Sequence, residues 1–367
     1  MPIKVCHITT VHQANDNRIF FKECTSLTDA GYEVVLLCAN AISTERNGVQ
    51  IIGFKGHRSR VKRFFLTSLF SAYNEALKIN AALYHLHDPE LVWTGLLLKL
   101  SGKKVIMDVH ENNAAAILSR PYIKAAFTRK LLSGFIKLIE AITLPFFNGI
   151  VTARPDISDL FPKLNPVTVR NFPILPDYDQ IPDISLDKEK KAIIYVGGAT
   201  RIRGIIELIE AMDSVESAEL WILGPFESQE FLQECKSMNG WRNVRYLGVV
   251  EADKIFPYIK AADVGIITFL PLPNHITTLA TKPFEYMACG LPVIMSNFHY
   301  WKSFFGESAI YVDPSNSAEI AKAIDELMHD DQKLLELKKM NLQLAREEYN
   351  WQKEKEKLLN LYQKVLN

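Results

Sequence analysis

Lys282 and Glu285 carry opposite charges where the sequence predicts the start of a helix. Pro283 has the fixed φ that suits a first helical turn, and apolar residues recur at helical spacing up to Gly290, which favours a helix end. The N–H groups of a first turn have no partner within the helix, so they attract anions. An ordinary βαβ unit would explain the apolar residues. It would not explain a lysine and a glutamate together at the helix start.

A second stretch with phosphate-binding chemistry lies near the middle of the chain. An apolar strand is followed by Gly197 and Gly198, then by Arg201 and Arg203, and an apolar helical pattern comes next. Glycines let a backbone approach a ligand closely, and arginines donate planar pairs of hydrogen bonds to phosphate oxygens. A Gly-Gly pair alone is weak evidence. Together with Lys282 it predicts a diphosphate-binding site.

The first half of the chain reads as a doubly wound parallel sheet, because apolar strand-like runs alternate with helical patterns. Ligands of such sheets lie beyond the carboxyl ends of the strands. The polar residues at those ends are Gln13, Asp16, Arg18, His87, Asp88, His110 and Glu111. Taken alone, a histidine such as His110 is as often structural as functional. Its position directly after the strand 104–109 places it at the edge of the sheet where ligands bind.

The segment Lys-Pro-Phe-Glu-Tyr-Met-Ala-Cys-Gly-Leu-Pro-Val-Ile, residues 282–294, resembles the donor-site motif of the retaining GT-B glycosyltransferases of family four. The resemblance implies an α/β protein with two Rossmann-like, doubly wound parallel-sheet domains facing a cleft. In that family two glutamates eight positions apart hold the transferred sugar and the ribose of the nucleotide. Glu285 matches the second glutamate. Thr277 stands at the first, a departure that concerns the sugar contact.

Further site residues follow from the same resemblance. Arg203 matches a lysine of the family, Gly198 stands at its usual arginine, and Arg201 is inferred to replace that arginine. Asn171 resembles an asparagine that faces the donor, and His110 occupies the place of a histidine near the transferred sugar. The expected catalytic residues are therefore His110, Arg203 and Lys282. The expected donor-binding set is Gly198, Arg201, Arg203, Asn171, Thr277, Thr278, Lys282 and Glu285, with no metal and no cofactor besides the donor substrate.

The chain has 367 residues, more than one hydrophobic core usually serves. We expect an acceptor domain over residues 1–170, a proline-rich linker over 171–190 and a nucleotide-sugar domain over 191–345. The last helix, 346–367, is expected to fold back on the first domain, as family members commonly do. Asp177 and Asp179 mimic a metal-binding Asp-x-Asp motif, but their place in a proline-rich connector makes the match a chance one.

The net charge of zero conceals a basic first half and an acidic second half. Residues 1–170 hold 21 Lys+Arg against 13 Asp+Glu, and the remainder holds 21 against 29. Residues 55–70 join a basic cluster to aromatic residues, and 124–137 are basic and apolar. Both patterns suit an anionic membrane surface. A solvated face over domain core is the alternative, left open for 124–137.

The location expected from the sequence is cytoplasmic, peripheral on the inner face of the membrane. Five cysteines show neither paired nor metal-ligand spacing, which fits a reducing compartment. The first residues turn polar too soon for a signal peptide, and the apolar stretch 131–151 is interrupted by charges and a proline.

The resemblance predicts transfer of a hexosyl group from a UDP- or GDP-linked sugar to an acceptor hydroxyl with retention of configuration. The acceptor is expected to be a glycan or a polyprenyl-diphosphate-linked oligosaccharide of bacterial surface-polysaccharide synthesis, and nucleic acid is not expected as a partner. Two alternatives stay open. One is a catalytically silent GT-B subunit at the membrane, favoured by Thr277. The other is a GT-B sugar-nucleotide 2-epimerase.

Overall fold

The computed structural model describes residues 2–57, 59, 62–118, 125–188, 190–251 and 254–367. Contacts divide the chain into unit 1, made of Met1–Asn171 and Trp351–Asn367, and unit 2, made of Phe172–Asn350. Residues 172–188, in the stretch expected as a linker, belong to unit 2, where Phe172 and Ile181 are buried in the core.

Unit 1 contains an eight-stranded sheet in the order β3-β4-β2-β1-β5-β6-β7-β8. Every pairing is parallel except that of β3 with β4, as a doubly wound sheet with one added edge strand requires. The strands are β1 (Lys4–Thr9), β2 (Glu33–Ala39), β3 (Thr44–Arg46), β4 (Val49–Phe54), β5 (Leu83–Leu86), β6 (Lys104–Val109), β7 (Gly149–Thr152) and β8 (Val167–Thr168).

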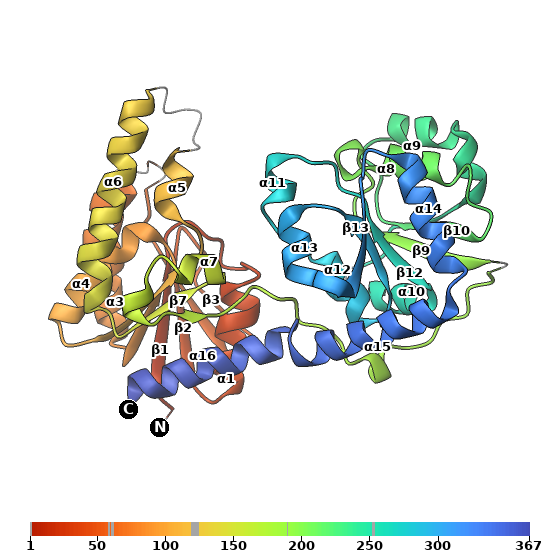
Figure 1. The fold of residues 1–367 in the computed structure, drawn as a ribbon. Coiled ribbons are helices and arrows are strands. Elements are labelled where there is room, and N and C mark those ends of the chain that lie inside the picture. Colours follow the sequence, from red (N-terminus) through yellow and green to blue (C-terminus); the bar gives the residue numbers. More distant parts are fainter. Residues whose placement is uncertain (1, 58, 60–61, 119–124, 189, 252–253) are drawn as a thin grey trace. The chain divides into compact units, whose positions relative to one another are not determined.

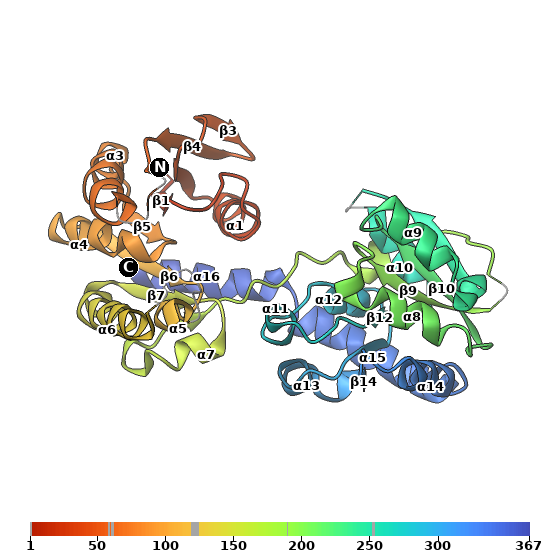
Figure 2. The same ribbon diagram turned by 90° about the horizontal axis from the view of Figure 1, so that it is seen from above.

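Helices cover both faces of this sheet, and each face has its own hydrophobic core (Figure 1). One face is covered by α3 (Tyr73–Ile79), α4 (Val92–Leu100) and α6 (Ala126–Thr143), and Figure 2 shows α3 and α4 next to each other. The opposite face is covered by the π-helix η1 (Ile19–Cys24), α1 (Thr25–Asp29) and the last helix, α16 (Trp351–Leu366). The shorter elements are η2 (Arg63–Ala72), η3 (Pro89–Leu91), α5 (Asn113–Leu118), η4 (Leu144–Phe146), α7 (Pro155–Ser158) and η5 (Pro162–Leu164).

Unit 2 is built on a six-stranded, fully parallel sheet in the order β11-β10-β9-β12-β13-β14. Its strands read as near-continuous apolar runs because both faces are buried. They are β9 (Lys191–Val196), β10 (Ala218–Leu223), β11 (Val244–Gly248), β12 (Val264–Ile267), β13 (Val293–Ser296) and β14 (Ala309–Val312). Both predicted parallel sheets are therefore present.

The helices of unit 2 also form two layers. Helices α8 (Ile205–Ala211), α9 (Gln229–Lys236) and α14 (Ser317–Met328) pack on one face, and α10 (Ile255–Ala261), α12 (Lys282–Ala288), α13 (His299–Phe305) and α15 (Asp331–Glu347) on the other. The remaining elements are η6 (Tyr178–Gln180), η7 (Arg201–Arg203), η8 (Asn239–Asn243), α11 (Pro273–Ile276) and η10 (Gly306–Ser308). In the described part of the chain, the search for a helix both long and apolar enough to cross a bilayer finds none.

Candidate active site

A glycine-containing loop of unit 2 joins β9 to η7 and α8. Gly197 has a φ of +132° and Gly204 a φ of +72°, values that side chains with a Cβ rarely adopt. A Cβ on Gly204 would also lie 1.9 Å from the carbonyl oxygen of Thr268. Glycine at position 204 therefore lets the loop lie directly against the residue that follows β12.

Arg203 and Lys282 come together over this loop. A Cβ built on Gly197 would lie 3.4 Å from Arg203 Nη1 and 3.9 Å from Lys282 Cε, so both cationic side chains lie against the same glycine. Arg203 Nη1 donates to the carbonyl oxygen of Gly198 at 3.1 Å, and its guanidinium lies 5.4 Å from the ring centre of Phe269. Two positive charges from segments distant in sequence thus share one small site.

Glu285 belongs to the same site. Its Oε2 accepts a hydrogen bond of 2.6 Å from Lys282 Nζ, and the two side chains are 13% and 24% exposed. A lysine ammonium has three donors. With one donor used by Glu285, Lys282 can bind a further oxygen.

Helix α12, which carries this ion pair, is fixed to the sheet by Tyr286. The ring lies so close to β12 that a Cβ on Gly265 would come within 2.3 Å of it. The phenol oxygen accepts a hydrogen bond of 2.9 Å from the N–H of Val196, the last residue of β9. Burial raises the pKa of Tyr286, so the phenol stays protonated. One side chain therefore ties α12 to the strand that leads into the glycine loop.

Three other predicted donor residues of unit 2 have partners elsewhere. Arg201 forms an ion pair with Glu234 of α9 and stacks on Phe231, with its guanidinium 4.6 Å from that ring centre. The hydroxyls of Thr277 and Thr278 donate to the carbonyl oxygens at the start of α11, at 2.8 and 2.5 Å.

Asn171, expected to contact the donor, and the pair Asp177 and Asp179, which mimics a metal motif, all have side-chain partners. Asn171 belongs to unit 1, where its Oδ1 accepts a hydrogen bond of 2.7 Å from Lys22 Nζ. Asp177 and Asp179 face Arg346, whose Nη2 lies 3.7 and 3.1 Å from their carboxylate oxygens. This cationic partner explains the two carboxylates without a metal.

A cavity of about 490 Å³ in unit 1 opens at the carboxyl ends of β1, β5 and β6. Most of the polar strand-end residues named from the sequence line it. Its lining includes His12, Asp88, Glu90, His110 and Glu111. The structure thus gathers His110 and several carboxylates at one edge of the sheet, where parallel sheets bind ligands.

Asp108, at the carboxyl end of β6, contacts Arg18 and two histidines of this edge. Its Oδ2 accepts hydrogen bonds from Arg18 Nε and Nη2 at 3.1 and 2.9 Å. His110 Nε2 lies 3.0 Å from the same oxygen, and His87 Nδ1 lies 3.6 Å from it. Burial opposes ionisation, yet Arg18 and then His110 hold the pKa of Asp108 well below its usual value. An anionic Asp108 favours the tautomer of His110 with its proton on Nε2, which leaves Nδ1 as an acceptor.

Beneath the cavity lies a buried cluster that the sequence reasoning missed. Tyr362 of α16 places its hydroxyl 2.9 Å from His85 Nδ1 and 3.0 Å from His7 Nε2, and His7 Nδ1 is 2.8 Å from His87 Nε2. Glu23 of η1 is fully buried beside these rings. Burial lowers the pKa of His7 and His85 and raises that of Glu23. A signal was available, because His87 lies two positions after His85 and directly follows β5, and extended residues two positions apart share a face.

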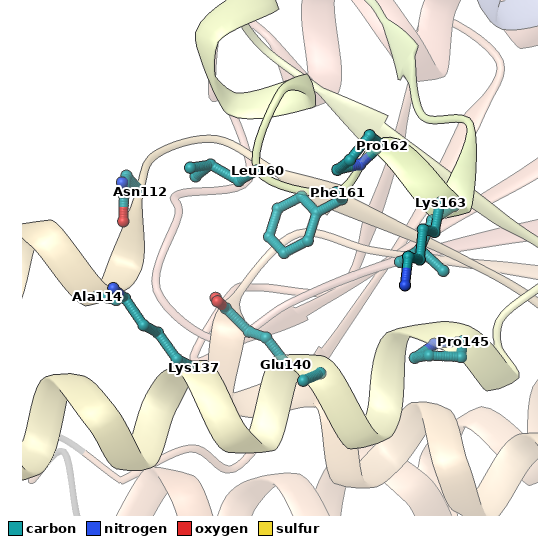
Figure 3. Close-up of a pocket in the computed structure, with 11 residues that line it drawn as sticks. Asn112, Ala114, Lys137, Glu140, Pro145, Leu160, Phe161, Pro162 and Lys163 are labelled. Atoms are coloured by element: carbon teal, nitrogen blue, oxygen red, sulfur yellow. The ribbon is translucent and has the colours of Figure 1, made fainter.

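A second cavity of unit 1, of about 530 Å³, lies between α6 and the segment 160–164 (Figure 3). Apolar residues form most of its wall. Glu140 points from α6 toward Phe161 in this view, and its Oε1 accepts a hydrogen bond of 3.0 Å from Asn113. Burial raises the pKa of Glu140. Lys137 and Lys163 also line the cavity.

Comparison with known proteins agrees with this architecture. Among solved structures, a glycosyltransferase from Rickettsia africae superposes with a TM-score of 0.73 at 12% identity, covering 100% of this chain and 99% of that one. HepE from Anabaena, solved in complex with UDP, superposes with a TM-score of 0.66 at 12% identity over 99% of this chain and all of HepE. At these identities the likeness shows the fold. Two Rossmann-like units of this kind define the GT-B class.

Sequence comparison shows which known family unit 2 resembles. Residues 190–330 match the family model of glycosyl transferases group 1. The glycosyltransferase MJ1607 of Methanocaldococcus jannaschii is 30% identical over 153 residues, which are 40% of this chain and 38% of that protein. The chain spans less than half the length of the curated relatives it matches. The resemblance seen in the motif is confirmed: residues 190–330 of unit 2 are similar to the group 1 glycosyltransferases, and the fold is that of the GT-B class.

Proposed function

We propose that the protein transfers a hexosyl group from a UDP- or GDP-linked sugar to an acceptor hydroxyl, with retention of anomeric configuration as in its family. The observation that carries this proposal is the meeting of Arg203 and Lys282 over Gly197. Departure of a nucleoside diphosphate develops negative charge. Two preorganised cations beside a backbone that a phosphate can approach would stabilise that charge.

The other residues take supporting roles in this proposal. Glu285 holds the Lys282 ammonium through their 2.6 Å hydrogen bond, and its second oxygen accepts from a ribose hydroxyl. Gly198, Thr277, Thr278 and Asn171 stay candidate donor contacts from the family motif, whereas the ion pair of Arg201 with Glu234 argues against such a contact for Arg201. The charges of Arg203 and Lys282 would serve the leaving group without a metal ion.

We place the acceptor in unit 1, in the 490 Å³ cavity beside His110. His110 Nδ1, free to accept when Asp108 faces Nε2, would bind an acceptor or sugar hydroxyl. Carboxylates of the same cavity are suited to further hydroxyls, because an ionised carboxylate accepts several hydrogen bonds. A glycan fits this lining.

A lipid-linked acceptor of surface-polysaccharide synthesis is supported by the two helices beside that cavity. Phe64 of η2 and Ile136 of α6 line it. The same helices expose large apolar side chains: Phe65, Leu66 and Phe70 on η2, and Phe127, Leu131, Leu132, Phe135, Leu138 and Ile142 on α6. An amphipathic helix with such a face binds at an anionic membrane surface. Of the segments expected to do so, residues 58, 60–61 and 124 lie outside the described part of the chain.

A donor screen tests the proposal. The purified full chain is incubated with UDP-, GDP- and ADP-linked hexoses, with and without polyprenyl-diphosphate-linked acceptors, and nucleotide release and product anomer are measured. We expect turnover with one nucleotide class and retention in the product. Nucleotide binding without turnover over the whole panel would instead favour a catalytically silent GT-B subunit. Thr277 in place of the usual glutamate would then account for the missing activity. Liposome flotation with and without anionic lipid tests the membrane contact separately.

A further inference from the structure

Four fully buried side chains converge in unit 1 under the sheet edge. His7 lies on β1, His85 on β5 and His87 directly after it, while Glu23 lies on η1. His7 and His85 are paired in the parallel register of β1 and β5. One nitrogen from each ring and one oxygen of Glu23 all lie within 4.8 Å of one another. Topology therefore brings three imidazoles and a carboxylate to one point.

The Glu23 carboxylate is the centre of this arrangement. Its Oε2 lies 3.9 Å from His7 Nδ1, from His85 Nδ1 and from His87 Nε2. Among the residues that the structure describes, neither Glu23 oxygen has a hydrogen-bond partner. Arg18 Nε lies 3.0 Å from Glu23 Oε1, but its N–H donates to Asp108. One guanidinium thus serves two buried carboxylates.

A buried carboxylate in this position needs a further positive partner or a proton, since buried charges in proteins are paired or coordinate a metal. We propose that His7, His85, His87 and Glu23 bind a divalent transition-metal ion, with Zn²⁺ the ion that best suits three imidazoles and one carboxylate. In a tetrahedral zinc site the ligand atoms are about 3.4 Å apart, given bonds of roughly 2.0–2.2 Å. The ligand atoms here, 2.8 to 4.8 Å apart, bracket that spacing.

The surroundings of His7 and His87 resemble the outer shell of a metal site. Metal-binding histidines usually donate their second nitrogen to a carboxylate, a carbonyl or a water, and ligating carboxylates are themselves held. Here His7 Nε2 faces the Tyr362 hydroxyl at 3.0 Å, and His87 Nδ1 faces Asp108 at 3.6 Å. Tyr362 also contacts His85 Nδ1 at 2.9 Å. On binding the ion, His85 exchanges this hydrogen bond for the metal.

The proposed site is structural rather than catalytic. Four protein ligands fill the coordination sphere of a zinc ion and leave no position for substrate, whereas catalytic zinc keeps one position open. The ion would join β1, β5 and η1 directly below Asp108, and α16 would cover it through Tyr362. Because all four ligands are fully buried, the ion enters as the unit folds. The proposal does not rest on glycosyl transfer.

Metal analysis of the full chain, purified without a polyhistidine tag from zinc-supplemented cells, is the first test. We expect elemental mass spectrometry to find one Zn²⁺ per chain, and we expect a chelator to remove it slowly. Removal should lower the thermal midpoint of unfolding, and added Zn²⁺ should restore it. Co²⁺ in its place should give the ligand-field absorption of a tetrahedral nitrogen–oxygen site. None of these measurements depends on enzyme activity.

Variants then locate the ion. Glu23→Gln and His85→Gln should each weaken Zn²⁺ binding by at least about 100-fold, because each removes a ligand, and Tyr362→Phe by roughly 10-fold as an outer-shell change. His275→Gln, in unit 2, is the matched control and should leave zinc content unchanged. If Glu23→Gln does not fold, the loading of the unaltered chain and His85→Gln still decide.

Two outcomes would overturn the proposal. A chain that takes up no Zn²⁺ or Co²⁺ and whose thermal midpoint does not respond to them holds only a hydrogen-bonded cluster. Zinc that survives Glu23→Gln but is lost in His110→Gln lies instead at the neighbouring group of His87, Asp108 and His110.

Discussion

The two units use ionisable side chains in opposite ways. In unit 2, Arg203 and Lys282 lie partly exposed over a glycine, and each keeps donors free for a ligand. In unit 1, Arg18 and Asp108 are buried and bonded to each other. The first arrangement has spare hydrogen-bonding capacity at low cost, because its charges are still hydrated. The second holds its charges in a buried environment, so the loss of any partner has a high cost in stability.

This contrast separates binding from positioning. A partly exposed pair of cations can neutralise an arriving diphosphate, whereas a buried ion pair can hold a neighbouring side chain such as His110 in one orientation. Substitutions of Arg203 and Lys282 should therefore change activity more than stability. Substitutions beneath the cavity of unit 1 should change stability first.

The largest effect is expected from the cations of unit 2. Arg203→Ala or Lys282→Ala should lower kcat/KM for transfer by about 10²- to 10³-fold, as loss of one charge-stabilising group does elsewhere. Arg201→Ala is the matched control, because its guanidinium is paired with Glu234 on the surface. It should change kcat/KM by less than about threefold, since exposed ion pairs contribute little.

Steady-state kinetics of the three variants, with the thermal midpoint of each as a folding check, make the measurement. An equal loss for Arg201→Ala and Arg203→Ala would mean that the ion pair with Glu234 does not keep Arg201 from the donor.

The next largest effect concerns two glycines with nearly the same backbone. Gly204 in unit 2 and Gly102 in unit 1 have φ of +72° and +76°. A Cβ meets the Thr268 carbonyl in one case and nothing within 4 Å in the other. Gly204→Ala should cost about 3 kcal/mol of unfolding free energy from strain and overpacking together, and Gly102→Ala about 1 kcal/mol from strain alone.

Urea denaturation of the full chain measures both glycine variants. Equal losses would mean that the loop moves away from β12 to accept the methyl group, and the close approach would then not be required.

The sequence predicted the unit 2 site because its chemistry lies in two short segments. Lys282 and Glu285 are three residues apart, and Arg203 follows directly after a glycine loop, so local patterns show the helix start, the loop and the charges together. The presence of both sheets also follows from alternating strand and helix patterns, whereas the order of their strands does not. What the motif did not show is the partner of Arg201, since Glu234 reaches it through tertiary packing.

The buried cluster of unit 1 could not be assembled from spacing. His7, Glu23, His85 and Tyr362 come from four elements, and they meet only because β1 pairs with β5 while η1 and α16 cover the same face. A strand histidine in an apolar run predicts burial but not its neighbours. The π-helical winding of η1, which carries Glu23, was likewise not visible in the apolar pattern.

Each unit has a buried tyrosine whose hydroxyl is hydrogen-bonded, and its loss should have a smaller effect on stability than Gly204→Ala. Tyr362→Phe in unit 1 removes a hydroxyl that contacts two imidazoles, and Tyr286→Phe in unit 2 removes one that accepts from the N–H of Val196. Each change keeps the ring and leaves buried polar groups without a partner, so each should cost about 1–3 kcal/mol of unfolding free energy. Tyr286→Phe should also weaken donor binding, because α12 carries Lys282.

Urea denaturation and nucleotide titration of both tyrosine variants make the measurement. Weaker nucleotide binding in Tyr362→Phe but not in Tyr286→Phe would contradict the assignment of donor binding to unit 2.

The smallest effect tests a partly buried acid, Glu140, which belongs neither to the cation site of unit 2 nor to the histidine cluster of unit 1. Burial raises the pKa of Glu140 in the cavity of Figure 3, so its folded-state pKa exceeds its unfolded value of about 4.3. Its contribution to stability is therefore present below that unfolded value and is lost as the pH rises through the folded pKa. Glu140→Gln, which can still accept from Asn113, should stabilise the chain at pH 7 by less than about 1 kcal/mol and leave it unchanged near pH 4.

Glu326→Gln, an exposed helix position paired with Lys322, is the control and should show no such difference between the two pH values. A stabilisation of Glu140→Gln that persisted unchanged at pH 4 would arise from packing rather than from ionisation, because a neutral acid and an amide then occupy the same place.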